Sequence, residues 1–278
     1  MKINLWGVRG SIPTSGSDTK KYGGRTSSTM ISEEGNLLLL DAGSGIQEFN
    51  SLKLPAQERI DILLTHLHMD HIQGLGFFSP LFVPGLEVHI WGPYSNTQTL
   101  HSRISRYLSP PLFPVLIRDL PCNLVLHEVG NSNFDIGHFN IQSSFVIHPG
   151  PTVGYRINGK NSVFSYIPDH EPALGSNGMI RDSKWISGFE LASEADLLYH
   201  DGQYTTEEYD KKKGWGHSCI DDALLFASFC HVKSILISHH DPCHTDTQLN
   251  EIALHLKKTN PYLFNCELAM EGMEIELP

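Results

Sequence analysis

A run of metal-binding side chains stands at residues 65–71, which read Thr-His-Leu-His-Met-Asp-His. His66 and His68 are two residues apart, so in an extended chain their imidazoles project to the same side. Asp70 and His71 follow where the chain turns and can address a second ion. Imidazole and carboxylate together suit Zn²⁺, Mn²⁺ or Fe²⁺. The grouping predicts a metal centre, and the alternative is a loop of solvated polar residues.

Similar side chains follow short apolar runs elsewhere in the chain. Loops held by a rigid sheet are where catalytic groups tend to lie, so these positions are further candidates. They are Asp41, His148, Asp169, His170, His200, Asp201, His239 and His240. The other histidines have no such context, and we expect ordinary surface or core roles for them. They are His89, His101, His127, His138, His231, His244 and His255.

The elements that must position these residues alternate between strands and helices. Apolar runs of strand length occupy residues 37–40, 60–64, 88–91, 139–147, 162–167, 196–199 and 234–237. Helical periodicity occupies residues 97–108, 184–195, 219–229 and 247–258. This pattern predicts a mixed α/β sandwich with functional residues just past the strand ends. Since no linker or repeat is visible, we expect a single domain over residues 1–278. The Pro-rich stretch 109–121 predicts a packed excursion or lid over the site.

Composition narrows the functional classes. The chain has 278 residues, 40% of them hydrophobic and 18% charged, which is typical of a soluble enzyme. Five dispersed cysteines without a CxxC pair predict reduced thiols rather than disulfides or a zinc ribbon. Neither a secretory leader nor a membrane span is visible, so we expect a cytoplasmic protein. The net charge of −11 disfavours nucleic acid as a partner but allows small anions, because bound divalent cations can dominate the field inside a cleft.

The pattern His-x-His-x-Asp-His after a strand resembles the signature of the metallo-β-lactamase superfamily, and the family's later motifs follow in order along nearly the whole chain. The resemblance implies an αββα sandwich of two mixed β-sheets flanked by helices. It also implies two divalent metal ions, with Zn²⁺ preferred and Mn²⁺ or Fe²⁺ as alternatives.

The resemblance implies a ligand for each position of a binuclear centre. One ion would be held by His66, His68 and His148, the other by Asp70, His71 and His239, with Asp169 and a hydroxide bridging the two. Asp41 would orient the histidine loop through hydrogen bonds. We prefer His239 to its neighbour His240, because the family places this histidine directly after the strand and a Ser or Thr. We expect His170 and His200 to be structural or supporting residues.

Residues 214–218, Gly-Trp-Gly-His-Ser, resemble the phosphodiesterase branch, which includes ribonuclease Z and cyclic-phosphate diesterases. The resemblance implies that His217 is a catalytic residue supported by Asp201. We also expect Asp70 to be a catalytic residue in addition to a metal ligand. The alternative for His217 is a helix-start residue without chemistry. Ser218 would cap the following helix together with Asp221.

The beginning of the chain resembles a bacterial subgroup of cyclic nucleotide or cyclic phosphate phosphodiesterase-like proteins. The resemblance rests on residues 6–13 and 22–28, and residues 110–115 resemble that subgroup's lid. Arg25 replaces the usual Asn and is either a phosphate-facing cation or part of a surface salt bridge. The long basic arm with which ribonuclease Z grips tRNA is not found between His71 and His148.

These features together predict a phosphodiesterase that hydrolyses a small cyclic phosphodiester, first of all a 3′,5′-cyclic nucleotide. A metal-bridged hydroxide would attack phosphorus, and His217 would protonate the leaving oxygen as the general acid. The alternatives are a ribonuclease Z-like nuclease, a thioester or lactone hydrolase, and a non-catalytic metal-bound sensor. The expected partner is a small anionic phosphodiester, with no membrane, no preference for nucleic acid and, by analogy with relatives, a homodimer.

Overall fold

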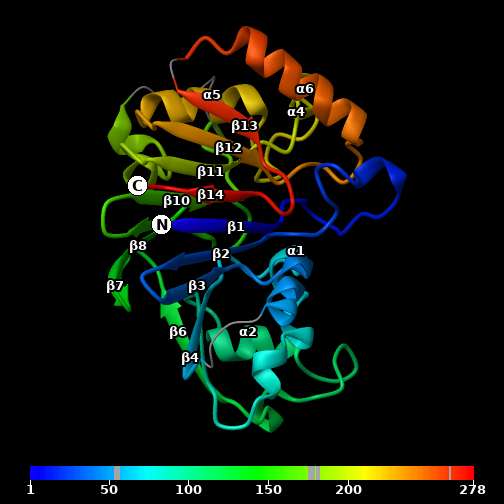
Figure 1. Cartoon of the computed structure of the whole chain (residues 1–278), viewed down its shortest axis with the longest axis vertical. Helices are drawn as coiled ribbons and strands as arrows, with labels where there is room; N and C mark the ends of the chain where they lie inside the picture. Colours follow the sequence, from blue (N-terminus) through cyan, green and yellow to red (C-terminus); the bar gives the residue numbers. More distant parts are fainter. Residues whose placement is uncertain (53–56, 175–178, 180–181, 263) are drawn as a thin grey trace.

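Two mixed β-sheets pack face to face, with helices on both outer faces (Figure 1). The structure is a computed structural model, and it describes residues 1–52, 57–174, 179, 182–262 and 264–278. This arrangement confirms the αββα sandwich expected from the sequence. In Figure 1 the helices α1 (Met69–Ile72) and α2 (Leu100–Tyr107) cover the outer face of the lower sheet, and α5 (Ile220–Phe229) and α6 (Asp246–Thr259) cover that of the upper one.

Within the described residues, the first sheet has seven strands and combines both pairing modes. In spatial order they are β14 (Glu274–Glu276), β1 (Lys2–Gly7), β2 (Ser28–Glu33), β3 (Asn36–Leu40), β4 (Arg59–Leu63), β5 (Glu87–Pro93) and β6 (Asn123–Val129). The pairs from β14 to β3 are antiparallel and those from β3 to β6 are parallel. The parallel strands therefore end together at one edge of the sheet.

The second sheet repeats this order of pairing modes over its seven described strands. They are β7 (Ser132–Ile136), β8 (Phe139–Phe145), β9 (Val153–Asn158), β10 (Val163–Ile167), β11 (Leu197–Asp201), β12 (Ser234–Ser238) and β13 (Asn265–Leu268). The pairs from β7 to β10 are antiparallel and those from β10 to β13 are parallel. The carboxyl ends of these parallel strands carry several of the candidate residues.

Three apolar cores follow from the alternation of side chains along the strands. Leu38 and Leu40 face the core between the sheets, together with buried residues of the second sheet such as Phe164. Leu39, between them, faces the core that α2 covers. A third core lies between the second sheet and its helices, where Ile235 contributes from β12. Burial of both sheet faces fixes the strands and so the loops at their ends.

The other described helical segments are short. They are α3 (Phe189–Ala192), α4 (Thr206–Tyr209), η1 (Ser17–Thr19), η2 (Ser44–Ser51), η3 (Leu75–Phe77), η4 (Ser79–Phe82), η5 (Ile117–Asp119) and η6 (Ser183–Trp185). The predicted helix 184–195 is wrong over most of its length. Gly188 adopts φ 73° between η6 and α3 and breaks it. In the part of the chain that the structure describes, none of the helices has the length and apolar character needed to cross a membrane.

Candidate metal centre

The candidate residues meet where strands of both sheets end. The loop that carries His66 and His68 follows β4, and α1 then begins at Met69. From the second sheet, β10 leads to Asp169 and β12 to His239. Two sheet edges therefore contribute to one site, and the loops are placed by buried strands on each side.

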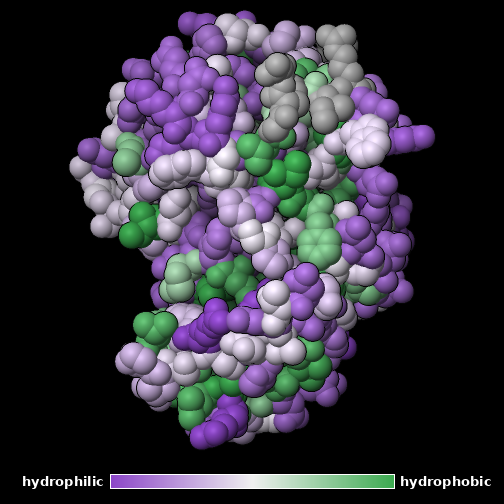
Figure 2. All heavy atoms as spheres, turned by 180° about the vertical axis from the view of Figure 1, so that it is seen from behind, coloured by the Kyte–Doolittle hydropathy of each residue, from purple (hydrophilic) through white to green (hydrophobic). Residues whose placement is uncertain are grey.

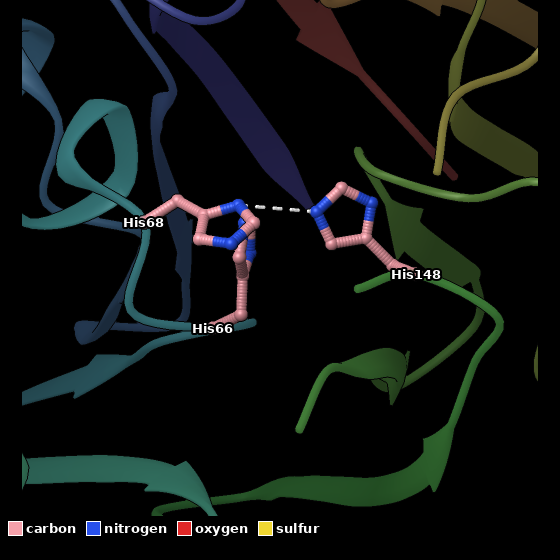
Figure 3. A group of neighbouring side chains, drawn as sticks. All are labelled: His66, His68 and His148. Atoms are coloured by element: carbon pink, nitrogen blue, oxygen red, sulfur yellow. Dashed lines mark hydrogen bonds between the residues drawn. The ribbon is translucent and has the colours of Figure 1, made fainter. Parts of the chain in front are cut away.

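Three histidines form one group of ligand atoms. The imidazoles of His66, His68 and His148 point toward one another, and the nitrogen atoms that could bind a metal lie within 4.8 Å of one another (Figure 3). His68 Nδ1 and His148 Nε2 are 3.2 Å apart. His148 Nδ1 lies 2.7 Å from the carbonyl oxygen of Gly216 and must donate to it, so Nε2 carries the free lone pair toward the group.

Asp70, His71 and His239 form a second group by the same criterion. The Oδ2 atom of Asp70 lies 3.4 Å from His71 Nε2 and 3.7 Å from His239 Nε2. The backbone N–H of Ser11 donates to the same Oδ2 atom at 2.7 Å and fixes the carboxylate. Both groups have the members that the family resemblance implies.

Asp169 lies between the two groups, and each of its oxygens faces one of them. Its Oδ1 atom is 3.0 Å from His71 Nε2 and 3.4 Å from His239 Nδ1. Its Oδ2 atom is 3.7 Å from both His66 Nε2 and His148 Nε2. A carboxylate that presents one oxygen to each of two ligand groups has the arrangement expected of a bridge between two ions.

Unpaired polar atoms test whether divalent ions fit this site. Among the described residues, His66 Nε2 and both ring nitrogens of His239 are buried and make no hydrogen bond. Buried polar atoms without partners are rare in proteins, because each costs free energy. The donors are nitrogen and carboxylate oxygen, which suit borderline divalent cations. The residues present therefore fit two such ions, as the fold implies.

The protonation of these histidines is compatible with metal binding. Burial lowers the pKa of His148 to about 4 and that of His239 to about 3, so both imidazoles are neutral at neutral pH. Burial also acts on His71, but the carboxylates of Asp169 and Asp41 outweigh it and hold the pKa of His71 well above its usual range. A bound cation would replace this proton among the buried carboxylates.

Asp41 holds the histidine loop, as expected. Its Oδ1 atom accepts from the backbone N–H of Thr65 at 2.8 Å, and its Oδ2 atom accepts from His71 Nδ1 at 2.8 Å. Tyr166 also donates its hydroxyl to Oδ2, at 3.1 Å. These contacts leave His71 Nε2 directed at the metal groups.

His217 lies at the edge of the same cluster, paired with Asp201. Its Nδ1 atom is 2.7 Å from Asp201 Oδ2 and 3.8 Å from Asp169 Oδ2. Burial lowers the pKa of His217, but Asp201 opposes this and raises it to about 9. Burial raises the pKa of Asp201 to about 6 despite the opposing effect of His217. At neutral pH the pair is an imidazolium and a carboxylate, which leaves a proton on Nε2 of His217.

The neighbouring histidines have other partners. His240 Nε2 lies 2.8 Å from the carbonyl oxygen of Ala269, away from the cluster, which agrees with the choice of His239. His170 Nδ1 pairs with His200 Nε2 at 2.9 Å in a buried contact. His170 and His200 therefore contact each other inside the fold, which agrees with the structural or supporting role expected for them.

Two interpretations of single residues are settled by their contacts. Ser218 does not cap α5: its hydroxyl donates to the carbonyl oxygen of His170 at 2.6 Å, and the N-cap residue is Cys219, without a side-chain cap. Arg25 forms salt bridges with Glu48 and Glu271, so it is a surface ion pair rather than a free cation.

The sequence reasoning gave no role to the residues that support the cluster from behind. Arg9 is fully buried and donates to the carbonyl oxygens of Asp241 and His244, at 2.9 and 2.7 Å, in the loop after His239. A side chain at Gly10 would collide with the His239 ring at 2.4 Å. Both residues lie within residues 6–13, the stretch that carries the resemblance to the bacterial subgroup, so that stretch contains the sequence signal for them.

A cavity of about 310 Å³ opens beside His66 and His68. Its walls come from the loop before α1, from α1 and α2, from the excursion and from the turn after His148: Leu67, Met69, Ile72, Arg103, Arg106, Tyr107, Leu112, Pro149, Gly150 and Pro151. The surface seen from behind is hollowed at mid-height (Figure 2). The excursion at residues 109–121 packs Phe113 into the core beneath and leaves Leu112 exposed in this wall.

Curated relatives share most of this chain. Ribonuclease Z of Porphyromonas gingivalis is 27% identical over 267 residues, covering 80% of this chain and 85% of that protein. Ribonuclease Z of Nanoarchaeum equitans is 25% identical over 279 residues, covering 86% and 83%.

Solved structures show the same fold at lower identity. The short form of human tRNase Z has a TM-score of 0.68 and 22% identity, with 100% of both chains covered. A diphosphatase of the PhnP family has a TM-score of 0.69 and 18% identity, covering 99% of this chain and 96% of that one.

A family model described as "Beta-lactamase superfamily domain" matches residues 36–240, which include all seven predicted metal ligands. The match spans well over half of the chain, and the two-sheet fold and the sequence motifs agree with it. The protein therefore belongs to the metallo-β-lactamase superfamily.

Proposed function

We propose that this protein is a metal-dependent phosphodiesterase that hydrolyses a small cyclic phosphodiester, with a 3′,5′-cyclic nucleotide as its first candidate substrate. One observation carries the proposal: His217, held by Asp201 at 2.7 Å, stands beside the two candidate metal groups. Cleavage of a phosphodiester expels an alkoxide, and a positioned imidazolium is suited to protonate it. Thioester and lactone hydrolysis gives this pair no evident task.

In this proposal His66, His68 and His148 would hold one ion and Asp70, His71 and His239 the other, with Asp169 shared between the two groups. Ions bound there would supply a water acidic enough to react at neutral pH and would neutralise charge on the phosphoryl oxygens. We take Zn²⁺ as the first choice of metal, with Mn²⁺ and Fe²⁺ as alternatives.

The chain's own residues orient the site and move the proton. Asp41 fixes His71 through Nδ1, and Gly216 fixes His148 in the same way, so both rings present Nε2. Asp201 accepts from Nδ1 of His217, from the backbone N–H of His170 at 3.2 Å and, through Oδ1, from that of Gln203 at 2.9 Å. A carboxylate held in this way stabilises the imidazolium while Nε2 gives its proton to the leaving oxygen.

A ribonuclease Z-like nuclease is the second candidate, because the two curated relatives described above carry that name at 27% and 25% identity. The same His217 chemistry would serve either substrate. The net charge of −11 argues against a long polyanion, since contacts to phosphates dominate nucleic-acid affinity.

Turnover of the metal-loaded protein tests the proposal. The panel consists of 3′,5′- and 2′,3′-cyclic nucleotides and a precursor tRNA with a 3′ trailer, with p-nitrophenyl acetate as the ester control. We expect cyclic nucleotides to be hydrolysed faster than the ester. Efficient, salt-sensitive removal of the trailer, with no cyclic-nucleotide turnover, would replace the proposal with the nuclease. Turnover of the ester alone would refute both.

A further inference from the structure

An aromatic and basic segment stands directly before His217. Residues 211–216 read Lys-Lys-Lys-Gly-Trp-Gly, three consecutive lysines in a chain of net charge −11. The side chain of Trp215 is largely in solvent, with 58% of the residue exposed. Trp215 exposes apolar surface, which is unfavourable, and it precedes a candidate catalytic residue by two positions. Its exposure therefore needs a physical explanation.

The backbone on both sides of Trp215 is fixed by one buried carboxylate. Glu171 is 1% exposed, and its Oε1 and Oε2 atoms accept from the backbone N–H groups of Gly214 and Gly216, each at 2.8 Å. Tyr209 also donates its hydroxyl to Oε1, at 2.9 Å. A buried charge satisfied by loop N–H groups orders the loop strongly, so the exposure of Trp215 does not come from an unanchored loop.

The same loop packs against the metal groups. Gly216 accepts from His148 Nδ1, and its φ of 92° is one that other residues rarely adopt. A Cβ atom there would lie 2.1 Å from Pro149 Cδ, so only glycine allows this approach. Trp215 is therefore the chain neighbour of Gly216, whose carbonyl oxygen accepts a hydrogen bond from the proposed metal ligand His148.

The cation of Lys212 lies over the ring of Trp215. Lys212 Nζ is 3.9 Å from the centroid of Trp215 and 5.9 Å from that of Tyr204. The Tyr204 and His217 ring centroids are 6.1 Å apart. Lys212 thus covers part of the indole, and Tyr204 is a neighbour of both Lys212 and His217. Among the described residues, no aromatic ring stacks on Trp215, and Lys212 is the cation over it.

We propose that Trp215 is a stacking platform for a nucleobase of the substrate, with Lys212 beside it as the cation that matches the substrate's negative charge. The inference rests on the proposed phosphodiesterase and names its substrate class: phosphodiesters that carry a base, in preference to base-free phosphodiesters. Every base has a flat π-face, so stacking on Trp215 favours nucleotides in general over one particular base.

Binding of a product-like nucleotide to the zinc-loaded protein tests this directly. Calorimetry compares AMP with ribose 5-phosphate, which has the same phosphate and no base. We expect Trp215→Ala to weaken AMP binding by roughly five- to a hundredfold, the range of base–aromatic stacking. Ribose 5-phosphate binding should not change, and Trp215→Phe should recover part of the AMP affinity.

Tryptophan fluorescence gives an independent readout with a matched control. Trp185 is also exposed, at 74%, and no described lysine lies over its ring. AMP should quench the wild type and Trp185→Phe equally, whereas Trp215→Phe should lose most of the quenching. Glu171→Gln should weaken AMP binding in the same direction as Trp215→Ala, because the platform loses one of its anchors.

The results separate the inference from the function on which it rests. Equal binding of AMP and ribose 5-phosphate, or AMP binding unchanged by Trp215→Ala, overturns the platform, even if the protein hydrolyses bis(p-nitrophenyl) phosphate. Base-dependent binding through Trp215 without any diesterase activity supports the platform and refutes the proposed function. A hexauridylate competitor identifies the source of the base: affinity equal to that of AMP indicates a mononucleotide, and affinity more than tenfold higher indicates an RNA strand.

Discussion

His217 Nδ1 and Asp201 Oδ2 are 2.7 Å apart, and the Asp201 side chain is completely buried. Asp201 receives two backbone N–H groups besides this contact, so the carboxylate cannot turn away from the imidazole. The orientation of His217 is therefore set from behind, while its Nε2 atom remains available to a substrate. The first two predictions follow from this pair.

Replacing His217 should damage turnover without removing metal. We expect His217→Ala to lower kcat for poor leaving groups by roughly 10²–10⁴, the range for loss of a positioned acid. The loss should shrink with p-nitrophenolate, which needs little protonation. Metal analysis and kinetics with good and poor leaving groups check this. Loss of metal in the variant would instead make His217 a ligand, and an equal loss across leaving groups would indicate substrate binding.

Replacing Asp201 should change the pH dependence. The general acid must be protonated, so activity falls as pH rises through the pKa of His217, which Asp201 raises to about 9. In Asp201→Asn the charge that raises this pKa is gone, and the alkaline limb should move to lower pH by roughly one unit or more. A pH–kcat profile of both proteins measures the shift. An unchanged alkaline limb would show that this limb does not report His217.

Removing the bridge should halve or abolish metal binding. Asp169 presents one oxygen to each ligand group, so Asp169→Asn should bring the metal content from about two ions per chain to one or fewer. Asp61→Asn is the matched control, since Asp61 is a buried aspartate that pairs with Arg59 and Trp91 instead. Elemental analysis after gel filtration decides. Two ions retained in Asp169→Asn would contradict the bridging assignment.

Metal should stabilise the fold. Each ion that binds only the folded chain adds about 2.7 kcal/mol at a hundredfold excess over Kd. For a chain of this size that corresponds to roughly 5–10 °C in Tm. A chelator should therefore lower Tm, and Zn²⁺ should restore it. The double variant His66→Ala/His71→Ala should show no response to either, and a response there would place the stabilising ion elsewhere.

The fold and the grouping of candidate residues were predictable for a chemical reason. Metal binding restricts both the residue types and their spacing, so the run from His66 to His71 is recognisable without structural information. The strands were detectable where both faces are buried, as in β4 and β12, because such strands consist of continuous apolar residues. Which distant residues meet, including His239 in preference to His240, was implied by the resemblance to the metallo-β-lactamase superfamily and not by these local features.

What the sequence could not supply depends on contacts between distant residues. Glu171 lies 43 and 45 positions from the two glycines whose N–H groups it accepts, and no local pattern encodes this distance. Ser218 matched a helix cap by spacing, but a buried carbonyl oxygen of His170 attracted its hydroxyl instead. Gly188 interrupts the predicted helix 184–195 because it adopts a positive φ. That backbone angle cannot be recognised from the apolar periodicity of the sequence.

The division of the candidate ligands between the two sheets also determines when a complete metal site can form. During synthesis the chain leaves the ribosome in order, and the ligands from His66 to His71 emerge long before His239 does. An ion that binds before His239 is synthesised would meet only part of the ligand set. It would therefore exchange readily with other metal-binding molecules. Since the two sheets must pack before the full set assembles, we expect the complete set of candidate ligands to be available only in the folded chain.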